Sequence, residues 1–262
     1  MSPLIAVAEN IAQARQMDSI SHVLPWSSFA EFFKSRIYDR TVVNRPFLTY
    51  YDDDRQLHCT YSYVEFGTLV QRAATFLHDQ VGIRRGDRLA TILFNHDATV
   101  VLYFAAWISG ITVVPINVDE PTDKKRFILE HSEAAAVCCW HSYVEEVHGL
   151  QRDLNALQHV IALNDEGFME NKSHGARDQK SHDPFAPGHA SHAGSLEDEA
   201  LIVYTSGTTG HPKGVVLTVE NLLTDADAIA DWHHFGASDR LMCVLPIHHV
   251  NGMVVTLVTP FF

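Results

Sequence analysis

The chain has 262 residues, of which 46% are hydrophobic, a share that is typical of globular proteins and excludes disorder along the whole length. It carries 19 basic and 32 acidic residues, for a formal net charge of −13. An acidic surface repels phosphate backbones, so this charge argues against non-specific binding to nucleic acid. The short basic runs at 84–85 and 124–126 do not offset it, and we interpret them as a solvated turn and a solvated helix face.

Residues 1–45 are expected to form an N-terminal helical segment. Apolar residues recur at helical spacing over Leu4–Met17 and again over Phe29–Ile37. No basic region followed by an apolar run marks a secretory signal, and no stretch reaches the roughly 20 apolar residues of a membrane span. The four cysteines form no C-x-x-C pair. These features predict a cytoplasmic protein with free thiols and no transmembrane segment.

Strands and helices are expected to alternate over residues 46–163, which form the first α/β subdomain. Ser62 and Glu65 match an S-x-x-E capping box at the start of a helix that runs to about residue 78. Asp97 is expected to cap a later helix that ends before Gly110. The other expected strands are 47–51, 57–61, 88–94, 112–116, 134–140 and 159–163, with further helices at 123–131 and 142–157. This alternation predicts an α/β fold with βαβ units around a parallel sheet.

Residues 164–199 break this pattern. The segment is rich in His, Ser, Gly, Asp and Pro and holds few large apolar residues, so it predicts a long flexible loop. Its histidines raise the question of a metal site, and His189 and His192 could sit close together. However, no cysteine or ordered scaffold completes a tetrahedral set, so the histidines are only a compositional hint of metal binding. The histidines in question are His174, His182, His189 and His192.

Regular structure is expected to resume over residues 200–262. Leu201–Tyr204 is apolar enough for a strand covered on both faces, Thr218 can cap a helix over 219–232, and 241–245 is expected to be another strand. The last ten residues, Met253–Phe262, are almost all apolar. Such a stretch needs a partner surface, which is unusual for a natural terminus, so we expect a chain that is cut inside a core element.

The run Tyr204–Val215 (YTSGTTGHPKGV) carries the chemistry of this sequence. Glycines let consecutive backbone N–H groups turn toward a ligand and form an anion-binding nest. Hydroxyl groups add hydrogen-bond donors, and Lys213 adds a positive charge suited to a polyphosphate. The run is neither a Walker A loop, because Gly214 follows the lysine, nor a G-x-G-x-x-G loop. A flexible Ser/Gly turn is the alternative, but generic turns rarely combine this hydroxyl density with a lysine directly after a buried strand.

Residues 204–215 resemble the phosphate-loop signature of the AMP-forming adenylating superfamily, which includes acyl-CoA synthetases, peptide-synthetase adenylation domains and firefly-type luciferases. Three further stretches resemble other motifs of that superfamily in the right order: Tyr61–Phe66, Trp107–Asn117 and Leu245–Gly252. The resemblance extends from about Phe47 onward, with 164–199 as a poorly matching insertion. It implies the layered βαβ sheets of the large N-terminal domain of adenylate-forming enzymes, here truncated, with 200–262 as the incomplete phosphate-loop segment of the same domain.

The resemblance also implies roles for individual residues. Residues of the loop would hold the phosphates of ATP, and Thr205 could help to hold Mg²⁺. His249 would line the acyl pocket near the reacting carboxylate, although a core histidine is as plausible from residue type alone; His248 is interpreted as structural. The expected phosphate-binding residues are Thr205, Ser206, Gly207, Thr208, Thr209, Gly210 and Lys213.

The activity implied is that of an AMP-forming acid–thiol ligase. A carboxylic acid and ATP would give an acyl-adenylate, which coenzyme A would then capture as a thioester. No catalytic residue is expected within these 262 residues, because the catalytic lysine of the family lies in a C-terminal lid domain further along the chain. We therefore expect a fragment that is inactive alone.

The run 245–252 looks more like acyl-CoA synthetases than like amino-acid-activating enzymes. Two alternatives remain open at this point. One is an amino-acid adenylation domain that passes its product to a carrier protein. The other is a short form that binds nucleotide, or a partner, without catalysis.

Overall fold

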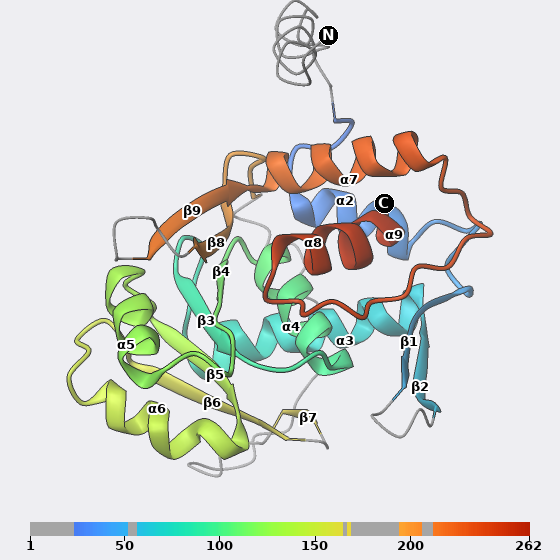
Figure 1. Cartoon of the computed structure of the whole chain (residues 1–262). Coiled ribbons are helices and arrows are strands. Elements are labelled where there is room, and N and C mark those ends of the chain that lie inside the picture. Colours follow the sequence, from blue (N-terminus) through green and yellow to red (C-terminus); the bar gives the residue numbers. More distant parts are fainter. Residues whose placement is uncertain (1–23, 52–56, 165–166, 169–193, 206–211) are drawn as a thin grey trace, which may run out of the picture.

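The structure is a computed structural model that describes residues 24–51, 57–164, 167–168, 194–205 and 212–262. Its centre is a seven-stranded sheet in the order β7-β6-β5-β3-β4-β8-β9 (Figure 1). Neighbouring strands from β6 to β8 run parallel, whereas β7 and β9 pair antiparallel at the two edges. The strands are β3 (Arg88–Ile92), β4 (Thr112–Pro115), β5 (Ala136–Trp140), β6 (His159–Asn164), β7 (Gly167–Phe168), β8 (Glu199–Thr205) and β9 (Lys213–Thr218).

Helices cover both faces of this sheet. α3 (Tyr63–Phe76) and α4 (Asp97–Ile108) pack on one face, and α5 (Thr122–His131) and α6 (Val144–Gln151) pack on the other. The adjacent Cys138 and Cys139 illustrate the alternation of a strand, because each joins the core on a different face. Burial raises the pKa of both thiols, that of Cys139 to about 12, so both remain protonated. The predicted α/β class with a parallel sheet is confirmed.

A second, two-stranded sheet lies beside α3. β1 (Pro46–Tyr51) and β2 (Leu57–Ser62) pair antiparallel, as expected, and the capping box that follows is also confirmed. The Ser62 hydroxyl accepts the N–H of Glu65 at 3.4 Å, and the Glu65 carboxylate accepts the N–H of Ser62 at 2.9 Å. α3 then continues as a π-helical turn over Leu77–Val81. The expected helix at 4–17 lies outside the described residues.

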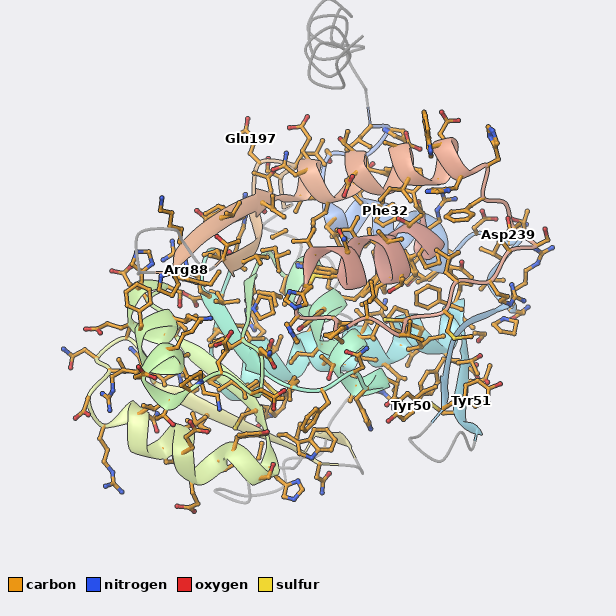
Figure 2. All side chains as sticks on the ribbon, in the orientation of Figure 1. Phe32, Tyr50, Tyr51, Arg88, Glu197 and Asp239 are labelled. Carbon is orange, nitrogen blue, oxygen red and sulfur yellow. The ribbon has the colours of Figure 1, made fainter. Side chains whose placement is uncertain are left out.

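The apolar C-terminal run packs into an aromatic core. α7 (Val219–His233) is followed by α8 (Val250–Met253), a π-helical turn (Val254–Val258) and α9 (Thr259–Phe261). Phe261 is 1% exposed, and its ring lies 5.1 Å from that of Phe104 and 5.6 Å from that of Phe32. Phe32 belongs to α2 (Phe29–Ile37), which lies next to the C-terminal helices (Figure 2). The partner surface that this run requires is therefore within the described chain itself.

The expected strand at 241–245 is wrong. Leu241 and Cys243 are half-buried, whereas Met242, Val244 and Leu245 are exposed, at 80%, 71% and 49%. A strand needs a neighbour to hydrogen-bond with, and no strand in the described ranges pairs with these residues. The continuous apolar run in the sequence therefore indicated neither burial nor pairing.

Two helix boundaries also differ from expectation. The helix expected over 142–157 is shorter: 141–143 form a 3-10 turn, and α6 ends at Gln151. The Gln151 amide donates to the carbonyl of Gln158 at 3.0 Å, which folds the following turn back against the helix end. The N-cap of α4 is His96 rather than Asp97, because the His96 ring accepts the N–H of Ala98 at 3.2 Å.

Strand β9 was not predicted from the sequence. Within 164–199, residues 165–166 and 169–193 lie outside the described residues, so the expected loop and its four histidines remain untested there. The described ends of this segment are β7, which pairs with β6, and a turn in which Asp198 N–H bonds to the Ser195 carbonyl at 3.2 Å.

Candidate functional site

The hairpin β8–β9 brings together Thr205 and Lys213, the two predicted phosphate-binding residues that the structure describes. Thr205 is the last residue of β8, Lys213 is the first residue of β9, and the two are register partners across the hairpin. Both are exposed, and neither side chain has a hydrogen-bond or ion-pair partner among the described residues. The remaining predicted residues, Ser206, Gly207, Thr208, Thr209 and Gly210, lie outside the described residues. A hydroxyl and a cation therefore stand side by side where an anion could reach both.

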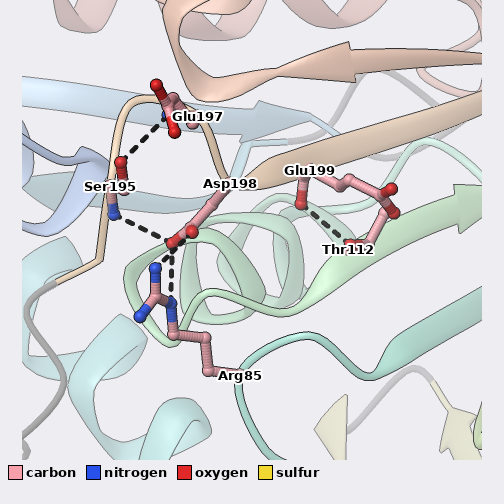
Figure 3. A network of polar contacts seen from close by, with 6 residues as sticks. All are labelled: Arg85, Thr112, Ser195, Glu197, Asp198 and Glu199. Carbon is pink, nitrogen blue, oxygen red and sulfur yellow. Dashed lines mark hydrogen bonds and ion pairs between the residues drawn. The ribbon is translucent and has the colours of Figure 1, made fainter.

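β8 is anchored at its other end by a charged contact (Figure 3). The Arg85 guanidinium donates twice to the Asp198 carboxylate, Nε to Oδ2 at 3.0 Å and Nη2 to Oδ1 at 2.5 Å. The same carboxylate accepts the N–H of Ser195 at 2.9 Å. Two parallel bonds between a guanidinium and a carboxylate fix direction as well as distance. This contact therefore sets where the chain enters β8.

Two side chains from the α4–β4 region hold the first residues of β8. The Thr112 hydroxyl donates to the carbonyl of Glu199 at 2.8 Å, as Figure 3 shows, and the Trp107 indole N–H donates to the carbonyl of Ala200 at 2.9 Å. Trp107 and Thr112 both belong to the stretch Trp107–Asn117. Side chains of this stretch thus hold the start of β8 in place through hydrogen bonds to its backbone carbonyls.

The run Leu245–Gly252 folds into a compact turn at the carboxyl end of β3. Asn95, three residues after β3, accepts the N–H of Ile247 at 2.9 Å and donates to the carbonyl of Leu245 at 2.8 Å. A Cβ at Gly252 would lie 2.5 Å from the Pro246 carbonyl oxygen, so only glycine fits there. Because β3, β4 and β8 are parallel, this turn lies at the same edge of the sheet as Thr205.

The two histidines of this turn differ in surroundings. His249 is exposed and is the N-cap residue of α8, without a side-chain capping bond. His248 is half-buried; burial, and then the nearby His249, lower its pKa below the ordinary value of 6.5. No hydrogen bond or ring contact in the described part of the chain joins His249 to Thr205 or Lys213. The structure therefore places His249 on a separate segment at the same edge.

Sequence reasoning missed several residues that hold this site in place: Asn95, Arg85 and Asp198. Asn95 follows an apolar strand and so lies at the carboxyl edge of the sheet, where α/β folds bind ligands. Its position in the sequence could therefore have marked it as a candidate site residue. Arg85 and Asp198 are 113 residues apart, and nothing local links them.

Neither a metal cluster nor a membrane span is found in the described residues. No group of three or more His, Cys, Asp or Glu side chains there could hold a metal ion. A role for Thr205 toward Mg²⁺ therefore rests on its hydroxyl alone. No described helix is both long and apolar enough to cross a bilayer.

Comparison with known proteins identifies the family. The AMP-binding enzyme family matches residues 36–262. A sulfoacetate–CoA ligase of Cupriavidus necator is 30% identical over 74% of this chain and 37% of that protein. A mitochondrial malonate–CoA ligase of Xenopus laevis is 27% identical over 93% of this chain and 39% of its own length.

Solved structures agree with this sequence match at the level of the fold. ATP-bound MatB from Rhodopseudomonas palustris superimposes with a TM-score of 0.67 and 24% identity, covering 89% of this chain and 43% of that one. A fatty acyl-adenylate ligase, from a study of the E. coli and L. pneumophila enzymes, gives a TM-score of 0.70 and 21% identity, covering 90% and 40%. The chain spans between 34% and 39% of the first three curated relatives. By its sequence match over residues 36–262, the chain belongs to the AMP-binding enzyme family.

Proposed function

We propose that this chain supplies the ATP-phosphate site of an AMP-forming acid–thiol ligase. In the reaction, a carboxylate oxygen bonds to the α-phosphorus of ATP while pyrophosphate leaves, which gives an acyl-adenylate. The sulfur of coenzyme A then bonds to the acyl carbon, AMP leaves, and the thiol proton is released. Positioning and charge stabilisation are the contributions that a protein makes to such a reaction.

The observation that carries this proposal is the pairing of Thr205 with Lys213 at the open end of the hairpin. Lys213 is exposed and has no carboxylate partner among the described residues, so its charge is available to a polyphosphate. Thr205 presents a hydroxyl beside it. We assign Ser206, Gly207, Thr208, Thr209 and Gly210 to the same phosphate contact on the sequence motif alone. Mg²⁺, when bound with ATP, would neutralise phosphate charge, and we propose the Thr205 hydroxyl as a contact for it on the sequence motif.

His249 is proposed to face the acid substrate. It is exposed on a turn that Asn95 fixes at the carboxyl edge of the sheet, where α/β folds bind ligands. Relatives are named for sulfoacetate, malonate and 2-succinylbenzoate, acids that each carry a second acidic group. We therefore propose a small acid with two anionic groups as the substrate class.

The test is acid-dependent exchange of labelled pyrophosphate into ATP, measured with the complete gene product purified from its source. The panel contains malonate, sulfoacetate, 2-succinylbenzoate, acetate and the amino acids, and a second assay detects CoA thioesters by mass spectrometry. We expect exchange and thioester formation with at least one of the acids that carry two anionic groups.

A Lys213→Gln variant is the matched control, because it keeps a long polar side chain and removes the charge. It should show weaker exchange with the same acid. Exchange with amino acids and no CoA product would support a carrier-protein-linked enzyme instead. ATP binding without exchange for any acid would support a non-catalytic nucleotide binder.

A further inference from the structure

The outer half of the hairpin that carries Thr205 and Lys213 has little support from the sheet. β8 pairs with its parallel neighbour β4 at one register position only, Val113 with Leu201. From Ile202 to Thr205, β8 pairs only with β9, which is an edge strand. Ile202 is buried in the core, Val203 and Tyr204 are only partly buried, and Thr205 and Lys213 are exposed. The direction of the outer end of the hairpin therefore depends on the side-chain contacts that Val203 and Tyr204 make.

One such contact comes from the last turn of α5. The Tyr204 hydroxyl and the His131 Nδ1 are 2.8 Å apart, and their rings meet edge to face at 5.7 Å. His131 is itself held by stacking on Phe127, four residues earlier on α5, with ring centroids 5.3 Å apart and an interplanar angle of 21°. Burial raises the pKa of Tyr204, so its hydroxyl keeps its proton, and which atom of the pair donates depends on the imidazole tautomer. Ser132, the residue after His131, also contacts this hydroxyl.

The partner of Tyr204 across the hairpin explains the glycine after the lysine. Tyr204 and Gly214 are register partners, and a Cβ at Gly214 would lie 3.2 Å from Tyr204 Cζ and 3.1 Å from Ile202 Cγ2. The tyrosine ring thus lies over the Gly214 backbone, as aromatic side chains do opposite strand glycines. A larger residue would require the tyrosine ring or Ile202 to shift by a few tenths of an ångström.

We propose that Tyr204, Gly214 and His131 form a clamp that positions the phosphate-binding end of the hairpin, with His131 as a positioning residue on α5. The clamp lies one register position from Thr205 and Lys213. It therefore holds the backbone of Thr205 and Lys213 in place before a polyphosphate binds, which lowers the cost of binding. This inference rests on the proposed phosphate-binding function.

The test is a double-mutant cycle on the affinity for Mg–ATP, measured by isothermal titration with the 262-residue chain. Tyr204→Phe keeps the ring over Gly214 and removes the hydroxyl, and His131→Leu removes its hydrogen-bond partner on α5. Each should weaken ATP binding by about two- to ten-fold, the range of one net hydrogen bond. The loss in the double variant should be smaller than the two single losses combined, because the two variants share one bond.

Two further variants separate positioning from general stability. His131→Asn keeps a polar atom at the δ position and should restore most of the affinity. Tyr103→Phe removes the hydroxyl that lies 3.3 Å from Thr91 Oγ1 in the core; it should lower Tm and leave ATP affinity unchanged. Equal ATP affinity in Tyr204→Phe and the unmodified chain would overturn the clamp.

Amide hydrogen exchange tests the clamp without nucleotide. Residues 203–205 and 213–215 should exchange faster in Tyr204→Phe and His131→Leu, and at the normal rate in Tyr103→Phe. If the unmodified chain binds no ATP, the proposed function fails, and the exchange rates still decide whether the clamp exists. Unchanged exchange in both clamp variants would refute it.

Discussion

The side-chain oxygen of Asn95 accepts a hydrogen bond from the N–H of Ile247 at 2.9 Å. The side-chain NH₂ group of Asn95 donates to the carbonyl of Leu245 at 2.8 Å. One side chain thus satisfies a donor and an acceptor of a turn about 150 residues later in the sequence. His248 and His249 directly follow this fixed point. The carboxyl end of β3 therefore determines where both histidines lie.

Replacing Asn95 by Ala should release this turn. Two hydrogen bonds are lost at a partly solvated position, so we expect a loss of about 1–2 kcal/mol in the free energy of unfolding. The amide of Ile247 should lose protection in hydrogen exchange. Asn95→Asp is the matched variant, because it keeps the acceptor for Ile247 while a carboxylate oxygen without a hydrogen replaces the amide that donates to Leu245. Its Ile247 amide should stay more protected than in Asn95→Ala, and equal protection in the two variants would contradict the assignment.

Lys213→Gln should weaken ATP binding without weakening the fold. The side chain is exposed and has no partner among the described residues, so the apoprotein should change by less than about 0.5 kcal/mol. The increase in Tm that ATP produces should shrink markedly, because a charged contact with phosphate is lost. Thermal scans with and without Mg–ATP measure both quantities. A lower Tm in the absence of ATP would show that Lys213 supports the fold rather than a ligand.

Stability should fall as pH decreases below 6.5, in part because of His248. Burial and the neighbouring His249 lower its pKa in the folded state, so the unfolded chain takes up a proton at this residue before the folded chain does. Unfolding then binds protons, and the free energy of unfolding decreases with falling pH until the folded-state pKa is passed. His248→Asn lacks this titration. The Tm of the variant minus the Tm of the unmodified chain should therefore increase as the pH is lowered from 7.5 to 5. A difference that stays constant over this range would refute the pKa assignment.

Phe261→Ala should be among the most destabilising substitutions in the chain. The ring is 1% exposed within the aromatic core, and emptying such a site costs about 3–5 kcal/mol. Urea unfolding provides the measurement. Trp232→Ala removes an even larger aromatic side chain that is 81% exposed on α7, so it should cost less than about 0.5 kcal/mol. Similar losses in the two variants would show that α9 is not part of the core.

Local signals in the sequence predicted much of this fold. The capping box at Ser62, the apolar strand around Cys138 and the helix after Thr218 depend on neighbouring residues, and all three are confirmed. The pairing of strands, by contrast, depends on residues that are distant in the sequence. The run 241–245 is apolar throughout but has no strand partner among the described residues, whereas β9 is a strand because it pairs with β8.

The candidate site divides in the same way. The motif predicted that Thr205 and Lys213 belong to one phosphate-binding loop. In the structure the two residues are register partners across the hairpin. The residues that support them come from elsewhere: His131 lies 73 residues from Tyr204. A single sequence shows no such contact, because nothing in the local pattern of either residue points to the other.

The binding of ATP and adenosine to this 262-residue chain, measured side by side with Mg²⁺ present, is the most direct test of the central claim. If the β8–β9 hairpin recognises the polyphosphate through Thr205 and Lys213, ATP binds saturably and adenosine binds at least about ten-fold more weakly, since contacts to charged groups contribute about 1.5–3 kcal/mol. Equal affinities, or no saturable ATP binding, would contradict it.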